Sequence, residues 1–126
     1  MVKLKAWKVL FIKDSRSSFD LSSISFDRFF SSTDVVDEDK ALELFESSQY
    51  DIVVSDLSFE PERLGFMKRL RDIKTNQEMF ALVSPEDTAK LYGIADLGIN
   101  AFELIPEQLE QALEVIAHFD PNDKGQ

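Results

Sequence analysis

Polar residues that could take part in chemistry stand at the ends of three short apolar runs in the sequence. Asp14 and Asp56 each follow such a run at a distance of two residues, and Ser84 follows a third run directly. Carboxylate and hydroxyl oxygens are the ligands that hard cations prefer, and a carboxylate can also act as a nucleophile in group transfer. The elements that carry these side chains decide whether they meet.

The sequence has five short apolar segments that we interpret as strands, and the central ones are continuous and rich in β-branched or aromatic residues, which is typical of strands buried on both faces. The five segments are residues 9–12, 35–36, 52–54, 80–83 and 102–105. Segments of helical periodicity alternate with them, at 15–32, 39–49, 62–73, 85–97 and 106–119. The first of these segments also alternates in part like a strand, and its serines lower its helix propensity. This alternation predicts an α/β fold, a doubly wound parallel sheet with helices on both faces.

Functional residues of doubly wound sheets gather in the crevice beyond the carboxyl ends of the strands. Asp14, Asp56 and Ser84 all follow strand ends, so the sequence predicts that they lie together at that edge.

The bulk composition bounds the class of protein. A length of 126 residues fits one domain, which we assign to residues 1–119, followed by a polar tail or linker start at 120–126. The net charge of −10 disfavours binding to nucleic acids and to anionic membranes. The chain has no cysteine, so disulfide scaffolds and thiol nucleophiles are excluded. The first apolar run is too short for a signal peptide or membrane span, and we expect a cytoplasmic protein.

The segment 51–57, DIVVSDL, resembles the strand of response regulator receiver domains that ends in the phosphoaccepting aspartate. The segments 81–84 and 102–106 are similar to the receiver segments that carry a switch hydroxyl, an aromatic residue and a proline. The resemblance implies a flavodoxin-like sheet with strand order 2-1-3-4-5. It also implies a signalling domain in a phosphorelay, not an enzyme, with a protein partner such as a histidine kinase or a downstream effector.

The resemblance assigns roles to individual residues and implies Mg²⁺ as the cofactor. It makes Asp56 the phosphoacceptor, Asp14 and the carbonyl of Ser58 further metal ligands, Ser84 the switch hydroxyl and Phe102 the switch aromatic. It places the interaction with a partner on the fourth and fifth helices and the fifth strand. Polar and aromatic residues of that region are Lys90, Tyr92, Glu103, Gln108 and Gln111.

Two substitutions depart from the receiver pattern. Lys13 stands in the place of the first acid, and Ile105 in the place of the lysine before the proline. Two carboxylates about 4 Å apart repel by roughly 4 kcal/mol at an effective dielectric near 20, so Asp14 and Asp56 need a cation between them. We therefore predict that Lys13 is a compensating cation and that the magnesium site is weakened.

Simpler interpretations stay open beside these. Asp56, Asp14 and Ser84 could each cap a turn or helix, Lys13 could point into solvent, and His118 suits the end of a helix. A phosphorylation-independent pseudo-receiver that binds a protein is the alternative function. A flavodoxin-like enzyme or nucleotide binder would need a glycine-rich loop after the first strand, and no glycine precedes Gly65.

Overall fold

A five-stranded parallel sheet forms the centre of the molecule. The computed structural model describes residues 7–13, 24–56, 62–83 and 98–118. Its strands are β1 (Lys8–Ile12), β2 (Ser32–Val36), β3 (Ile52–Asp56), β4 (Glu78–Val83) and β5 (Asn100–Glu103). Their order is β2-β1-β3-β4-β5, and every neighbouring pair is parallel. The predicted sheet and its strand order 2-1-3-4-5 are therefore confirmed.

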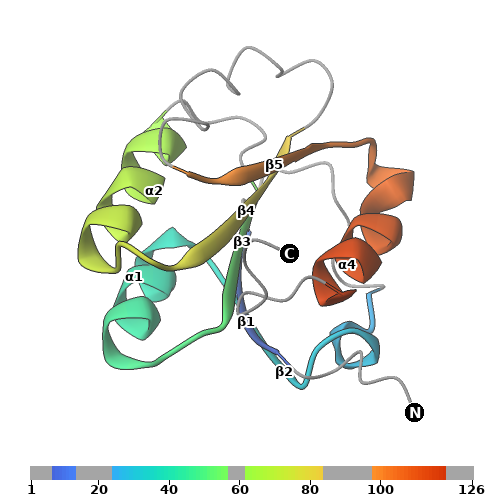
Figure 1. Cartoon of the computed structure of the whole chain (residues 1–126), viewed down its shortest axis with the longest axis horizontal. Coiled ribbons are helices and arrows are strands. Elements are labelled where there is room, and N and C mark those ends of the chain that lie inside the picture. The colour runs from blue at the N-terminus through green and yellow to red at the C-terminus, as the bar shows by residue number, and fades with distance from the viewer. Residues whose placement is uncertain (1–6, 14–23, 57–61, 84–97, 119–126) are drawn as a thin grey trace.

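Helices cover both faces of this sheet, as Figure 1 shows. Helices α1 (Glu38–Ser47) and α2 (Glu62–Ile73) lie on one face, and α4 (Leu109–His118) lies on the other. Two short 3-10 helices accompany them, η2 (Phe26–Arg28) and η5 (Pro106–Gln108). None of the helices in the described part of the chain is long and apolar enough to span a membrane.

The core consists of two layers that the sheet separates, because successive side chains of a strand point to opposite faces. In β3, Ile52 and Val54 belong to the layer under α4, whereas Val53 belongs to the layer under α1 and α2. The layer under α4 also holds Phe29, Phe30, Leu109, Leu113 and Ile116. The layer under α1 and α2 also holds Ala41, Phe45, Met67, Leu70 and Ile99. Burial on both faces explains why the central strands read as continuous apolar runs.

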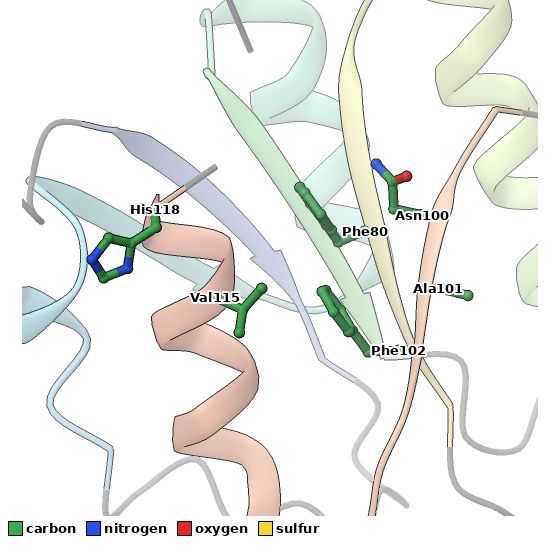
Figure 2. A pocket seen from close by; sticks show the side chains of 6 residues that line it. All are labelled: Phe80, Asn100, Ala101, Phe102, Val115 and His118. Carbon is green, nitrogen blue, oxygen red and sulfur yellow. The ribbon is translucent and has the colours of Figure 1, made fainter. Parts of the chain in front are cut away.

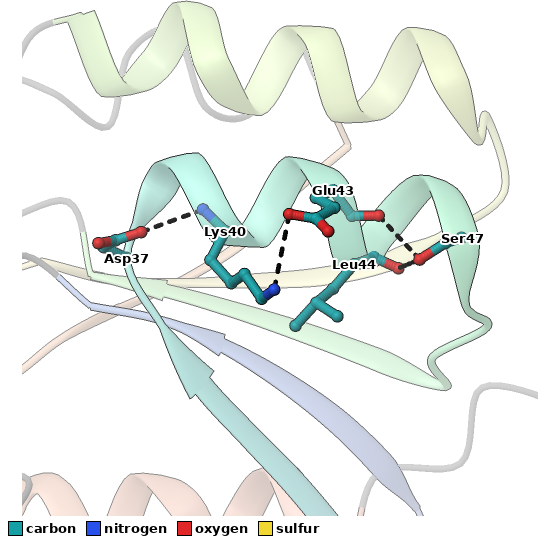
Figure 3. A network of polar contacts seen from close by, with 5 residues as sticks. All are labelled: Asp37, Lys40, Glu43, Leu44 and Ser47. Carbon is teal, nitrogen blue, oxygen red and sulfur yellow. Dashed lines mark hydrogen bonds and ion pairs between the residues drawn. The ribbon is translucent and has the colours of Figure 1, made fainter.

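Helix α1 has its amino end defined by a side-chain cap (Figure 3). Asp37 accepts a hydrogen bond at Oδ1 from the backbone N–H of Lys40, at 3.0 Å. The Lys40 side chain also reaches Glu43 one turn further along the helix, with 3.6 Å between Nζ and Oε1. At the end of the helix, the Ser47 hydroxyl donates to the Glu43 backbone carbonyl at 2.9 Å. The prediction of a helix over 39–49 is confirmed, with ends displaced by one or two residues because Asp37 caps and the helix ends at Ser47.

The segment before β2 differs from the prediction. We expected a helix over 15–32, but from residue 24 onward the chain forms only the 3-10 helix η2, and β2 begins at Ser32. Phe29 and Phe30 both enter the core under α4, and the Ser31 N–H donates to the Trp7 carbonyl at 3.0 Å. The helix prediction is therefore wrong for residues 24–32, because packing and pairing with β1 draw the chain into the sheet.

The last strand and helix also begin at other residues than predicted. The strand expected at 102–105 is β5 at Asn100–Glu103, because its register with β4 pairs Phe80 with Asn100. The helix expected over 106–119 begins with η5 and continues as α4 to His118. The predicted helix over 85–97 and the tail 120–126 lie outside the described residues.

Candidate functional site

Asp56 is the last residue of the central strand β3 and lies at the carboxyl edge of the sheet. It is 1% exposed, and its register partner on β4 is Leu82. Strand alternation places its side chain on the same face as Ile52 and Val54, the face covered by α4. A buried carboxylate at this edge costs free energy unless other groups compensate it.

Lys13 directly follows β1 and continues its pairing with β2, since its N–H donates to the Val36 carbonyl at 2.9 Å. The register between β1 and β3 pairs Ile12 with Ser55. One further residue along both strands brings Lys13 beside Asp56, and alternation gives both side chains the same face of the sheet. The Lys13 side chain is exposed, and within the described residues it forms no ion pair with a carboxylate. Its role as a compensating cation stays a prediction.

Three of the predicted site residues, Asp14, Ser58 and Ser84, lie outside the described residues. The same holds for two residues of the predicted interaction face, Lys90 and Tyr92. Within the described part of the chain, no three His, Asp or Glu side chains are grouped so that they could hold a metal ion. The described structure therefore contributes Asp56 as the single carboxylate of the proposed magnesium site.

Phe102, the predicted switch aromatic, lies on β5 and is half-buried. Its ring stacks on the ring of Phe80, with 5.7 Å between centroids and 9° between the planes. Ile105, which stands where receivers carry a lysine, is 44% exposed. Its backbone N–H donates to the Gln108 side chain at 3.0 Å. Ile105 therefore presents an apolar side chain at the surface and supplies no charge at this position.

A hollow of about 390 Å³ lies between β5 and the carboxyl-terminal half of α4 (Figure 2). Its lining comprises Phe80, Asn100, Ala101, Phe102, Val115 and His118. Val115 points from α4 toward the Phe102 ring, and it is 56% exposed. Sequence reasoning did not identify this hollow. The sequence feature that indicates the hollow is Val115, an apolar residue that lies off the helical stripe formed by Leu109, Leu113 and Ile116.

Comparison with known proteins bears on the fold. No model of a protein family matches the sequence, and no curated protein matches it. Among solved structures, the chain is similar to a response regulator receiver domain protein, described as CheY-like, from Methanospirillum hungatei JF-1. The TM-score is 0.63 at 10% sequence identity, and the match covers 89% of this chain and 94% of that chain. The chain has the fold of a receiver domain.

In this receiver fold, Asp56 occupies the position at which doubly wound sheets concentrate function, beyond the carboxyl end of a central strand. Its neighbour Ser55 is fully buried on the opposite face, and the Ser55 hydroxyl has no hydrogen-bond partner within the described residues. The side chains of Ser55 and Asp56 therefore point to opposite faces of the sheet, and Asp56 lies on the face that α4 covers.

A second group of polar side chains, Tyr50 and Asp34, lies toward the amino ends of the strands, away from Asp56. The Tyr50 hydroxyl donates to Asp34 Oδ2 at 2.7 Å, and the Lys8 ammonium lies 4.9 Å from the centre of the tyrosine ring. Burial, and then the hydrogen bond and charge of Asp34, raise the pKa of Tyr50 well above its usual range. Lys8 and Tyr50 adjoin the amino ends of β1 and β3, so this pair stabilises the fold at a distance from Asp56.

Proposed function

We propose that this chain is a receiver-like signalling domain of the cytoplasm, in which Asp56 accepts a phosphoryl group and the domain acts by binding a protein partner. The observation that carries the proposal is the position of Asp56: a buried carboxylate at the carboxyl end of the central strand of a receiver fold. Such a group can act as a nucleophile, because an aspartate carboxylate oxygen can attack phosphorus directly and form a covalent intermediate.

The proposed reaction is phosphoryl transfer from a phosphohistidine donor. One oxygen of Asp56 attacks the phosphorus, the P–N bond to the donor histidine breaks, and the imidazole leaves with the electron pair and takes up a proton. The product is an acyl phosphate on Asp56. Mg²⁺, when bound, supplies charge neutralisation for the phosphoryl oxygens. Asp56 offers the oxygen ligand that this ion prefers, and the other proposed ligands are Asp14 and the Ser58 carbonyl.

A phosphorylation-independent pseudo-receiver is the second candidate, and two observations favour it. Lys13 adjoins Asp56 where receivers carry an acid, so a cation replaces a metal ligand. Ile105 is an exposed apolar residue where receivers carry a lysine. On this alternative the domain binds its partner without phosphate.

Labelling with a small phosphodonor separates the two candidates. The protein is incubated with acetyl phosphate or phosphoramidate and Mg²⁺, and intact mass spectrometry follows the addition of one phosphoryl group. The first proposal expects labelling of the wild type, loss of the label in hydroxylamine and no labelling of Asp56→Asn. Asp72→Asn is the matched control, because Asp72 is an exposed carboxylate on α2.

Two outcomes of the labelling experiment would count against the phosphoacceptor proposal. An Asp56→Asn variant that labels as well as the wild type would overturn the assignment of Asp56. A wild-type protein that resists every donor, and whose amide spectrum does not change with beryllofluoride, would support the pseudo-receiver.

A further inference from the structure

Strand β5 forms one edge of the sheet, since it pairs with β4 alone. The Leu104 N–H donates to the Val83 carbonyl at 2.9 Å, which fixes the alternation of backbone groups along this segment. In a parallel pair, alternate residues turn both backbone groups toward the same neighbour. Phe102 therefore faces β4, whereas the N–H and C=O groups of Ala101 and Glu103 face outward. Within the described residues, no hydrogen bond engages these outward groups.

Within the described residues, this edge lacks several of the features that protect edge strands from further pairing. Proteins usually block such edges with lysine, proline or a bulge, or by shortening the strand. The sequence of β5 is Asn-Ala-Phe-Glu, which includes neither lysine nor proline, and Ala101 and Glu103 are both exposed. Shortness and one glutamate are the protections that β5 retains. An extended segment can therefore add to β5 as a sixth strand through the outward groups of Ala101 and Glu103.

The hollow beside β5 determines which side chain such a strand would place toward α4. Alternate side chains of an added strand point to the two faces of the sheet. On the α4 face they meet the half-buried Phe102 ring and the exposed Val115 (Figure 2). The hollow measures about 390 Å³, which has room for an aliphatic side chain. An apolar residue is the complementary partner on this face, because it would cover two apolar groups now partly in water.

Charges around the edge determine the residues on the other face. Glu103 follows Phe102 in β5, so its side chain points away from α4 and toward the second face. Glu110 of α4 does not contribute to this edge, because its carboxylate lies 3.8 Å from Arg28 of η2, next to β2 at the other edge of the sheet. Glu103 is therefore the charge that an added strand meets on the face away from α4, and a positively charged side chain is complementary to it.

We propose that the β5 edge binds an extended segment of a partner protein in which apolar residues alternate with lysine or arginine. The apolar residues enter the hollow at Phe102 and Val115, and the basic residues face Glu103. A second copy of this chain is a poor occupant, because each copy carries a net charge of −10. The inference rests on the proposed function in one respect, that the domain works by binding a protein.

The test uses synthetic peptides of alternating valine and lysine, with a matched peptide of alternating valine and glutamate. Binding to the whole chain is measured by fluorescence anisotropy and by amide chemical shifts. The valine–lysine peptide is expected to bind, to shift the Ala101 and Glu103 amides, and to slow their exchange with solvent. The valine–glutamate peptide is expected to bind at least about tenfold more weakly, and added salt should weaken the basic peptide.

Two variants test the strand addition and the hollow separately. Ala101→Pro removes the outward N–H and keeps the pairing with β4, because proline is tolerated at edge positions whose N–H faces solvent. It should weaken binding about tenfold, which equals about 1.4 kcal/mol. Ala101→Ser keeps the N–H and should bind as the wild type does. Val115→Asn replaces the apolar side chain in the hollow by a neutral amide at an exposed position and should also weaken binding of the valine–lysine peptide.

Several results would overturn the inference. They are failure of the valine–lysine peptide to bind, shifts that map to another surface, unchanged affinity in both Ala101→Pro and Val115→Asn, and a dimer that Ala101→Pro abolishes. Labelling of Asp56 is measured on the same variants. In these variants, normal labelling together with lost peptide binding supports both proposals, whereas a wild type that binds the peptide and is not labelled rejects only the phosphoacceptor role.

Discussion

Replacement of Lys13 by alanine should raise the affinity of the protein for Mg²⁺. The β1–β3 register brings Lys13 beside Asp56, and neighbouring strands lie about 4.8 Å apart. For an exposed ammonium at an assumed distance of about 8 Å from a bound Mg²⁺, the repulsion is about 1 kcal/mol at the dielectric of water and about 2 kcal/mol at half that value. These energies correspond to a gain in affinity of about 5-fold to about 30-fold for Lys13→Ala.

The assay is a Mg²⁺ titration followed by the backbone amides of β1 and β3. Trp7 fluorescence is unsuitable, because Trp7 precedes the amino end of β1 and Lys13 follows its carboxyl end. Lys68→Ala is the control, since it removes one exposed positive charge from α2. Lys13→Asp should bind more tightly than Lys13→Ala, because it adds a carboxylate, whereas Ile105→Lys alone should not restore binding. Equal affinity in the wild type and Lys13→Ala, or an equal gain in Lys68→Ala, would refute the reasoning.

Two further predictions concern the stability of the fold. Tyr50→Phe should lower the free energy of unfolding by about 1 kcal/mol at pH 7 by removing the hydrogen bond to Asp34, and urea unfolding measures this difference. Because the pKa of Tyr50 is higher in the folded state than in the unfolded state, the protonated hydroxyl stabilises the folded state. This stabilisation is fully present below about pH 10, the unfolded pKa, and is lost as the pH rises toward the folded pKa. The gap between wild type and Tyr50→Phe should therefore narrow above about pH 10, and a constant gap would contradict this. Leu113→Ala, at a fully buried position under α4, should cost about 2–5 kcal/mol in the same assay, whereas Val115→Ala should change stability by less than about 0.5 kcal/mol.

The sheet was predictable from the sequence because burial on both faces leaves a continuous apolar signal. The runs at 52–54 and 80–83 carried that signal, and the strands β3 and β4 contain them. Edge strands carry less of it. Strand β2 includes Ser32 and Asp34 and is held by pairing with β1 alone, so only its last two residues were recognised. Likewise β5 begins at Asn100, a poor strand former, because its register with β4 outweighs local propensity.

The site was predictable in part for a related reason. Asp56 was recognisable because a carboxylate stands two residues after an apolar run, which is a local pattern. The proximity of Lys13 to Asp56 depends on the register between two strands far apart in the chain, which periodicity alone does not give. The hollow at Val115 combines residues of β4, β5 and α4, so it exists only after the last helix packs against the sheet.

Trp7 joins the first strand to the last helix, since its indole N–H donates to the Ala117 carbonyl at 3.2 Å across 110 positions of the sequence. It is the only tryptophan in the chain. Contacts of such long sequence separation form after the loop-closure entropy of the intervening chain has been overcome. During refolding, the emission of this one indole therefore reports the docking of α4 onto the completed sheet, while circular dichroism follows the earlier local formation of helices. Trp7 fluorescence is therefore expected to follow the packing of α4 against the sheet without any added probe.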